Sequence, residues 1–537
     1  MQQKSNWNLF TYSALIALGI LIGIIFKPSE SVIQFVGGGK NKITEILSII
    51  KQSYVDEVDI DSLEESSISN LLTTLDPHSV YISAKDLAMA NEQLEGNFEG
   101  IGVEFNILND TIMVVSALSG GPSYELGIQP GDRIVSVDTM NVAGIGITNE
   151  KVFKLLRGPK GSVVNVGIYR PSVNTIIPFK ITRNTIPIFS VEAWFMLEPK
   201  TGYIKISRFA EHTHEEFLKA FKELEKEGLE NLVLDLRGNP GGYLNTATQI
   251  VDEFLSDGKL IVYTQGRTKP RSESKAQNKG VFENGKLIVL IDEGSASASE
   301  IVSGAIQDWD RGLVVGRRSF GKGLVQEPYE LKDGSAIRLT VSRYYTPSGR
   351  CIQKEYKNGK DYDHDILERY ETGEMEDENK AHIFDSTPYF TKVLLRKVYG
   401  GGGIYPDVFV PVDTSYISKF LTQVISKSLI SKFAYNYLDK NREFINQNYN
   451  LNSFTNTFQL TNEDLNKFVQ FVSENDVDIS NKQAIDKSIG FIKLQIKALM
   501  ARQLFRDKGY YMVMQQNDNA IKTAVKALNN YQNILKK

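Results

Sequence analysis

Hydrophobic and polar positions follow different periods in different parts of this chain. Isoleucines and leucines recur at helical spacing between Ile43 and Leu75, which predicts a small amphipathic helical segment. Further along, short apolar runs at 202–206, 231–237 and 287–291 alternate with stretches of helical period. Apolar runs of this kind are typical of buried strands, and their alternation with helices predicts an α/β core.

The polar pattern marks two further regions. Residues 354–381 are rich in Asp, Glu and Lys, so an exposed insertion is expected there. Residues 415–537 predict helices with Asn, Gln and Lys on their polar faces. Such helices could cap the core, form a homo-oligomer interface or bind an adaptor, and the pattern leaves these alternatives open.

The amino terminus carries an almost uncharged stretch from Leu9 to Phe26, between Lys4 and Lys27. Its length is close to the ~20 residues of a membrane-spanning helix and exceeds the ~7–15 residues of a signal-peptide apolar core. We predict an uncleaved signal anchor, with a cleaved signal peptide as the alternative. A lipoprotein anchor is excluded because this region contains no cysteine.

Composition limits the classes of function. The length of 537 residues suggests several domains, and the net charge of −4 gives no reason to expect a nucleic-acid partner. Cys351 is the only cysteine, which rules out an intrachain disulfide and a cysteine-based metal site. No metal or organic cofactor is indicated.

A serine-rich turn follows the apolar run 287–291. Its sequence is Gly-Ser-Ala-Ser-Ala-Ser-Glu, residues 294–300, and it opens a helical pattern. A strand-to-helix turn of small residues can present a serine hydroxyl together with unpaired N–H groups that bind an oxyanion. Taken alone, the turn is more typical of a helix N-cap, with Ser295 or Ser297 as the capping residue.

A lysine further along favours the catalytic interpretation. Lys322 lies between two glycines and beside Phe320 and Leu324, so burial would lower the pKa of its ammonium toward that of a general base. Histidine is the usual base for a serine nucleophile, but none of the five histidines lies in a motif with the serine turn. The amide of Gln326 could hold the lysine amine. A solvated loop lysine and an exposed strand glutamine are the structural alternatives.

Glycine-rich patterns occur at two earlier places. Gly-Asn-Pro-Gly-Gly at 238–242 follows an apolar run but lacks the Lys-Ser or Lys-Thr of a phosphate loop, so phosphate binding is discounted. Gly-Ile-Gly-Val at 100–103 precedes an expected strand, and the later Gly-Ile-Gln-Pro-Gly-Asp-Arg-Ile at 127–134 is similar to the pattern of PDZ domains.

Together, the segments 294–301 and 316–326 resemble the carboxyl-terminal processing proteases, also called tail-specific proteases. These are Ser-Lys endopeptidases that carry a PDZ domain. The resemblance extends from about Ile43 to about Pro411 and rests on several ordered motifs.

The resemblance implies roles for individual residues. Ser297 corresponds to the nucleophile, Lys322 to the general base and Gln326 to the residue that orients the base. The implied oxyanion donors are the backbone N–H groups of Ala298 and of Gly241 or Gly242.

PDZ domains bind an extended peptide as an added strand and hold its terminal carboxylate on backbone N–H groups of a glycine-rich loop. Here that loop would be Gly100, Ile101, Gly102 and Val103. The expected apolar groove is formed by Ile101, Val103, Val152 and Leu156. Arg157 could pair with a substrate carboxylate or with the catalytic core, and a solvated turn arginine is equally expected.

The expected fold is an α/β catalytic core, crotonase-like by resemblance, with an inserted PDZ domain, a small N-terminal helical segment and a helical C-terminal extension. The expected boundaries are 1–40 for the anchor and linker, 41–85 for the helical segment, 86–183 for the PDZ domain, 184–413 for the protease core and 414–537 for the extension.

The expected function is that of a serine endopeptidase that recognises protein or peptide substrates by their free C-terminal tails. The resemblance places it in the inner membrane as a single-pass protein, with the catalytic part on the periplasmic or extracytoplasmic side. A non-catalytic, membrane-anchored PDZ scaffold on an inactive protease core is the alternative.

Overall fold

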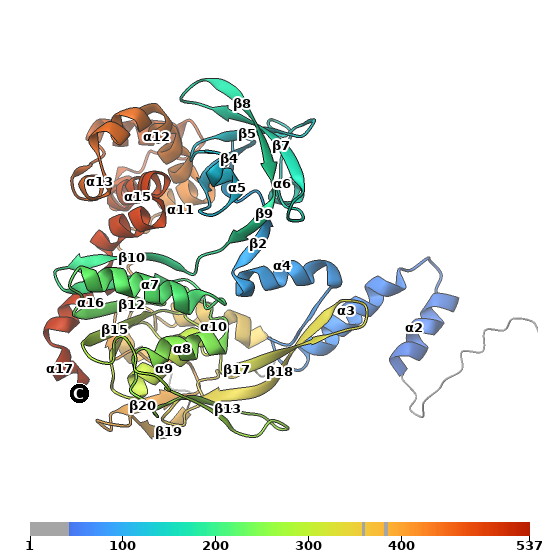
Figure 1. Ribbon diagram of the computed structural model, residues 1–537, viewed down its shortest axis with the longest axis vertical. Coiled ribbons are helices and arrows are strands. Elements are labelled where there is room, and N and C mark those ends of the chain that lie inside the picture. Colours follow the sequence, from blue (N-terminus) through green and yellow to red (C-terminus); the bar gives the residue numbers. More distant parts are fainter. Residues whose placement is uncertain (1–41, 357–359, 381–384, 537) are drawn as a thin grey trace, which may run out of the picture. The chain divides into compact units, whose positions relative to one another are not determined.

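The computed structural model describes residues 42–356, 360–380 and 385–536 (Figure 1). The chain forms two compact units, residues 1–68 and 69–537, which are described separately. The first contains α2 (Lys42–Ser53) and the beginning of α3 (Ile60–Thr73), so the predicted helices are confirmed. All other elements belong to the second unit.

An antiparallel β domain occupies residues 97–187. Its sheet has the order β3-β4-β5-β7-β8, with β6 beside β5, so β3 (Val103–Leu108) is an edge strand. A separate pair of β2 (Asn97–Gly100) and β9 (Asn184–Pro187) joins the two ends of the domain. The remaining elements are β4 (Thr111–Ala117), α5 (Pro122–Glu125), β5 (Arg133–Val137), β6 (Met140–Asn141), α6 (Asn149–Leu156), β7 (Val163–Arg170) and β8 (Thr175–Thr182).

The central sheet of the molecule has the order β10-β11-β12-β15-β16-β21. Only β10 and β11 are antiparallel to each other, and the rest of the sheet is parallel. The three apolar runs predicted as strands correspond to β11, β12 and β15, which lie side by side. The strands are β10 (Val191–Glu198), β11 (Thr201–Ile206), β12 (Asn231–Asp235), β15 (Lys286–Ile291), β16 (Leu313–Gly316) and β21 (Val408–Phe409).

Helices cover both faces of this sheet, which explains why its strands are apolar on both sides. One face packs against α7 (Thr213–Lys226), α8 (Leu244–Asp252) and α9 (Ala298–Asp308). The other face packs against α16 (Asn519–Asn529) and α17 (Tyr531–Leu535) (Figure 1). The last helices of the chain therefore complete the core.

A second sheet lies next to the candidate site and has the order β1-β18-β13-β14, with β17 paired to β18. The N-terminal strand β1 (Val80–Ile82) pairs with β18 (Ala336–Tyr345), so the segment just after residue 75 reaches the same sheet as β17 (Leu324–Glu330). The other elements of this region are α4 (Ala84–Glu95), β13 (Leu260–Gln265) and β14 (Ser272–Lys275).

The acidic and basic segment 354–381 is not simply an exposed insertion, and this part of the prediction is wrong. It contains α10 (Lys360–Glu371) and a 3-10 turn, η1 (Glu378–Lys380). Asp365, Arg369 and Glu374 are buried, because these charges pair with each other or with residues of the core. A hairpin of β19 (Asp385–Phe390) and β20 (Lys397–Gly400) follows.

The C-terminal region forms a helical bundle with its own apolar core. Its longest helix, α15 (Lys482–Met514), has a non-helical kink at Phe505 and Arg506 and contacts both β10 and β4. The bundle also contains α11 (Lys419–Ser426), α12 (Leu429–Asn448), α13 (Leu451–Thr457), α14 (Asn462–Ser473) and the short turn η2 (Gln515–Asn517).

The predicted membrane anchor at residues 9–26 lies outside the described residues. Among the residues that are described, no helix is long and apolar enough to span a bilayer, and even the long α12 and α15 carry many charged side chains. This finding contradicts the predicted single-pass inner-membrane localisation, and that prediction is corrected here.

Candidate active site

Ser297 occupies the last position before α9, directly after the turn that leaves β15. Its backbone has φ +54° and ψ −111°, a conformation that is rare for residues other than glycine and costs ~1–3 kcal/mol. Ser297 and Glu300 have the capping-box arrangement, in which the Glu300 carboxylate accepts the Ser297 N–H. The N-cap alternative therefore describes the position of Ser297, but among the described residues its hydroxyl donates no hydrogen bond, so the hydroxyl proton is not engaged by the cap.

The two neighbouring serines are engaged in structural hydrogen bonds. The Ser295 hydroxyl donates to the carbonyl of Leu236 at 2.9 Å, and the Ser299 hydroxyl donates to the carbonyl of Asn239 at 2.9 Å. Both serines are completely buried, whereas Ser297 is partly exposed. Of the three serines in the turn, Ser297 is the one whose hydroxyl is available to a substrate.

Lys322 lies in the loop between β16 and β17, with Gly321 on one side in a left-handed conformation of φ +89°. No hydrogen bond or ion pair engages its ammonium among the described residues. Burial lowers the pKa of Lys322, and the nearby Glu300 carboxylate opposes this lowering. An amine with a lowered pKa and no fixed partner can accept a proton, as a general base must.

Glu300 connects the serine turn to the lysine loop. One carboxylate oxygen, Oε2, accepts hydrogen bonds from the backbone N–H groups of Ser297 at 2.8 Å and Lys322 at 2.9 Å. The other oxygen accepts from the Gly321 N–H at 2.7 Å and the Ser319 hydroxyl at 2.5 Å. Burial raises the pKa of Glu300, and these four donors oppose that effect.

A second bridge comes from Tyr344 in β18. Its hydroxyl oxygen lies 3.0 Å from the Ser297 carbonyl oxygen and 2.7 Å from the Lys322 carbonyl oxygen. Neither bridging residue was predicted from the sequence. Glu300 had a signal, because Ser-x-x-Glu is the capping-box spacing, but Tyr344 had none.

Gln326 does not contact Lys322 through any hydrogen bond described in the structure. Its Nε2 donates to the Thr340 hydroxyl at 3.2 Å, and that hydroxyl donates to Asp76 Oδ1 at 3.0 Å. The Asp76 carboxylate lies close enough to raise the pKa of Lys322, although burial outweighs it. The amide of Gln326 is thus connected to the surroundings of the lysine through Thr340 and Asp76.

His78 also lies near the lysine. Its Nε2 is 2.6 Å from the Tyr362 hydroxyl, and its backbone N–H donates to Asp76 Oδ1 at 2.8 Å. Burial and the charge of Lys322 lower the pKa of His78 to about 4. The imidazole is therefore neutral at physiological pH.

The glycine turn 238–242 lies against the serine turn. A Cβ added to Gly241 would lie 2.8 Å from both the Ala296 carbonyl oxygen and Ser297 Cβ, so only glycine fits there. The Gly241 N–H already donates to Asn239 Oδ1 at 2.9 Å. Within the described part of the chain, the N–H groups of Gly242 and Ala298 have no such acceptor, which favours this pair over Gly241 as oxyanion donors.

The predicted peptide-binding residues fall into two groups. Gly100 ends β2, Gly102 follows in a left-handed conformation of φ +75°, and Val103 begins the edge strand β3. Ile101, Val152 and Leu156 are 2%, 0% and 4% exposed, so they belong to the interior of the β domain. The aromatic pair Phe105 and Phe153, with ring centroids 5.5 Å apart, connects β3 to α6 instead.

Arg157 is not a solvated turn residue. Its guanidinium pairs with the Glu92 carboxylate of α4 at 2.7 Å and lies over the rings of Phe98 and Phe153. Any role of Arg157 towards a substrate carboxylate is a prediction that would require exchange with Glu92.

Comparisons with known proteins agree with this architecture. Residues 200–366 match Peptidase family S41, residues 113–170 match the PDZ domain, and residues 420–507 match a family of unknown function, DUF8443. The chain is 39% identical over 323 residues to "Carboxy-terminal processing protease CtpB" of Bacillus subtilis (strain 168), a match that covers 59% of this chain and 66% of the relative.

Two further similarities lie in the same group. "Carboxy-terminal-processing protease" of Bartonella bacilliformis (strain ATCC 35685 / KC583 / Herrer 020/F12,63) is 37% identical over 316 residues, covering 58% of this chain and 71% of the relative. The solved "Photosystem II D1 C-terminal processing protease" is 28% identical, with a TM-score of 0.34 and coverage of 59% of this chain and 91% of that one.

The chain therefore belongs to peptidase family S41, among the carboxy-terminal processing proteases. The resemblance found in the sequence is confirmed, and by family the protein is a serine-type endopeptidase with a PDZ domain and a helical C-terminal region.

Proposed function

We propose that this protein cleaves polypeptides with a Ser297–Lys322 dyad and selects them by C-terminal tails bound to its PDZ domain. The observation that carries the dyad is the common attachment of both residues to Glu300 Oε2, at 2.8 and 2.9 Å. It joins a strained serine with an available hydroxyl to a half-buried lysine whose ammonium has no fixed partner among the described residues.

The proposed reaction begins with Lys322 as a neutral amine. The amine takes the proton of the Ser297 hydroxyl while Oγ bonds to the scissile carbonyl carbon. The resulting oxyanion accepts hydrogen bonds from the N–H groups of Ala298 and Gly242. The lysine ammonium then protonates the leaving amine, which leaves an acyl-enzyme. Water, deprotonated by the lysine amine, hydrolyses this ester, and the serine regains its proton.

Tail recognition is supported by the edge position of β3, where an added strand can pair. The preceding loop, with Gly100 and Gly102, allows close approach of a carboxylate to backbone N–H groups. The proposed domain boundaries are those expected from the sequence. We also infer a crotonase-like class for the core, supported by its parallel strands and by the helices on both faces.

The test uses the full chain and an unstructured protein with an apolar C-terminal tail. We expect the wild type to release new termini detectable by mass spectrometry, and Ser297→Ala and Lys322→Ala to release none. Cleavage that survives Ser297→Ala would overturn the assignment of the nucleophile. Tail binding without any cleavage by the wild type would instead support the scaffold alternative.

A further inference from the structure

The loop that carries Lys322, residues 317–323, is here called the base loop. It connects β16 to β17 and contains two glycines, Gly321 and Gly323, so its own backbone preferences do not fix its shape. Its position depends on the groups that bind its N–H and carbonyl groups.

The N–H groups at the end of the base loop are held by Glu300 of α9, through Gly321 and Lys322. The carbonyl groups are held from the other side by Arg369 of α10. Its Nη1 donates to the carbonyl oxygens of Arg318 at 3.2 Å and Ser319 at 2.9 Å, and its Nη2 donates to that of Phe320 at 3.3 Å. One guanidinium thus binds three successive carbonyls just before the candidate base.

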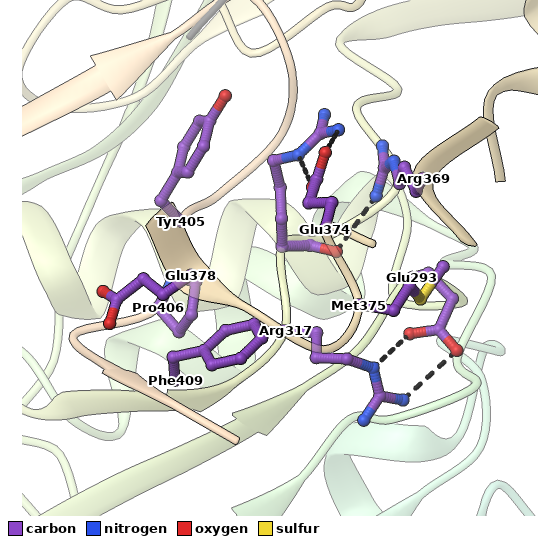
Figure 2. Close-up of a pocket in the computed structure, with 10 residues that line it drawn as sticks. Glu293, Arg317, Arg369, Glu374, Met375, Glu378, Tyr405, Pro406 and Phe409 are labelled. Atoms are coloured by element: carbon purple, nitrogen blue, oxygen red, sulfur yellow. Dashed lines mark hydrogen bonds and ion pairs between the residues drawn. The ribbon is translucent and has the colours of Figure 1, made fainter. Parts of the chain in front are cut away.

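Arg369 is itself held in place. It is 3% exposed, and its Nη2 lies 2.8 Å from Asp365 Oδ2, one helical turn earlier on α10. Figure 2 shows Arg369 beside Glu374, with its guanidinium directed at a backbone carbonyl oxygen. Glu374 itself pairs with the Arg318 guanidinium at 2.6 Å. Its Nε has no partner among the described residues, so the arginine stays buried despite incomplete hydrogen bonding.

The same face of α10 also contacts the side chain of Phe320. Tyr362, Asp365 and Arg369 have the spacing i, i+3 and i+7, which places them on one face of the helix. The Tyr362 ring contacts the Phe320 ring edge-on at 5.7 Å.

A buried lysine links α10 to the last residues before the base. The Lys354 ammonium lies 3.0 Å from Asp365 Oδ2 and 4.0 Å from the centroid of the Phe320 ring. The Lys354 N–H donates to the Gly321 carbonyl at 2.9 Å. Contacts from α10 and from the segment around Lys354 therefore extend to Gly321, the residue next to Lys322.

We propose that α10 is a positioning element for the base loop. Arg369 is its positioning residue, because it holds the loop backbone so that the Lys322 amine stays in its half-buried position. The inference rests on the proposed function in that Lys322 is taken as the general base. Arg369 touches no reacting atom in this scheme, and its effect passes through the backbone of residues 318–320.

The test compares Arg369→Lys with Arg396→Lys in the full chain. Lysine keeps the charge but lacks the planar fork that binds several carbonyls at once. Arg396 is a matched control, because its side chain is only 10% exposed and is paired with Asp310 and Asp407 rather than with the base loop. Competitive acetylation by acetic anhydride, followed residue by residue with mass spectrometry across a pH series, measures the pKa of Lys322 without any need for catalysis.

We expect Arg369→Lys to raise the pKa of Lys322 toward the ordinary lysine value and to lower kcat at least about tenfold with little change in KM. Arg396→Lys should leave the pKa of Lys322 unchanged. An unchanged Lys322 titration in Arg369→Lys would overturn the proposal. If Arg369→Lys fails to fold, Arg369→Gln, which likewise cannot bind three carbonyls at once, provides the same comparison.

The acetylation result is independent of peptide cleavage. A pKa of Lys322 that rises in Arg369→Lys supports the positioning role even if Ser297→Ala shows that the proposed nucleophile is wrong. Conversely, Ser297-dependent cleavage by the wild type together with an unchanged pKa of Lys322 in Arg369→Lys would support the proposed function and overturn the positioning role.

Discussion

Ser297 and Lys322 donate their backbone N–H groups to the same oxygen atom, Oε2 of Glu300, at 2.8 and 2.9 Å. The two candidate catalytic residues come from different loops, 25 positions apart in the printed sequence, with no regular secondary structure in common. A buried carboxylate therefore sets their relative position, and it does so through the backbone, leaving both side chains available for chemistry.

Replacing Glu300 by glutamine should reduce cleavage more than it reduces stability. The amide turns its NH₂ toward one of the two donor pairs, so at least the lysine loop loses an acceptor, at a cost of ~1–3 kcal/mol for each unpaired group. We expect kcat to fall about tenfold to a hundredfold, measured beside thermal unfolding.

Glu216→Gln is the matched control for this substitution. Glu216 also has a pKa raised by burial, and it accepts the N–H groups of Ser190 and Val191 at 2.8 Å, but it lies outside the candidate site. Similar losses of kcat in both variants would show that any buried carboxylate matters equally, against the bridging role of Glu300.

Substitutions of the three serines of the turn should differ in their effects on stability as well as on activity. Ser297→Gly relieves a backbone strain of ~1–3 kcal/mol against ~0.5–1 kcal/mol of added flexibility, so the free energy of unfolding should rise by about 1 kcal/mol while cleavage is abolished. Ser295→Ala and Ser299→Ala each remove a buried hydrogen bond to a carbonyl that keeps a backbone donor, and should lower the free energy of unfolding by ~0.5–1.5 kcal/mol.

Urea denaturation of the three variants measures these differences. Because Ser295 and Ser299 are buried, they are not neutral controls, contrary to what the sequence alone suggests. A Ser297→Gly variant less stable than the wild type would indicate that the serine hydroxyl has a structural partner after all.

Replacing Lys322 should raise the stability of the fold and abolish activity. Its pKa is lower in the folded protein than the ordinary 10.5, so the folded state binds fewer protons and its charge destabilises the fold at neutral pH. Lys322→Met should therefore unfold at a higher temperature than the wild type at pH 7, and the difference should shrink as the pH approaches about 10.5.

The cleavage rate should also depend on the titration of Lys322, because deprotonation of the ammonium creates the catalytic base. The neutral amine is the base, so the wild-type rate should rise with pH through the lowered pKa of Lys322. Lys322→Arg should be as inactive as Lys322→Met because a guanidinium does not lose its proton. A wild-type rate that stays flat from about pH 6 to pH 9 would argue against lysine as the base.

The sequence was sufficient for the strands of the core, and it also contains the motifs from which the dyad is proposed. The runs that became β11, β12 and β15 are apolar on both faces because helices cover both, and such runs need no tertiary information to be recognised. Ser297 and Lys322 stand in contiguous motifs. Their relation through Glu300 and Tyr344 was not predictable, since it depends on contacts between separate loops.

The exposure of some charged and apolar residues was predicted wrongly, because it depends on tertiary contacts that the sequence pattern does not show. Asp365 and Arg369 were expected at the surface, but charges can be buried when they pair, and the pairing is tertiary. Ile101, Val152 and Leu156 were expected to line a groove, yet apolar residues of a groove wall and of a domain interior follow the same sequence pattern.

Tail recognition is tested with two peptides that differ only in C-terminal amidation, titrated against the full-chain Ser297→Ala variant. If backbone N–H groups of residues 100–103 hold a carboxylate, amidation should weaken binding at least about tenfold, since hydrogen bonds to a charged group contribute ~1.5–3 kcal/mol. Equal affinities would remove the tail-reading mechanism but leave the protease assignment in place.

The C-terminal bundle should determine how firmly the β3–β4 hairpin of the PDZ domain is held. Tyr435 of α12 is 3% exposed and packs against Leu108, Met113 and Val115, and the Arg133–Asp439 ion pair at 2.7 Å lies next to this contact. Tyr435→Ala removes a buried ring, a change that typically costs ~3–5 kcal/mol for large aromatic side chains. We expect faster hydrogen exchange in residues 103–117 and unchanged exchange in β12 and β15.

Phe444→Ala, on the same helix but 60% exposed, is the control and should exchange like the wild type. If both variants left residues 103–117 equally protected, the bundle would not stabilise the PDZ sheet, and its contacts would have to serve the core alone.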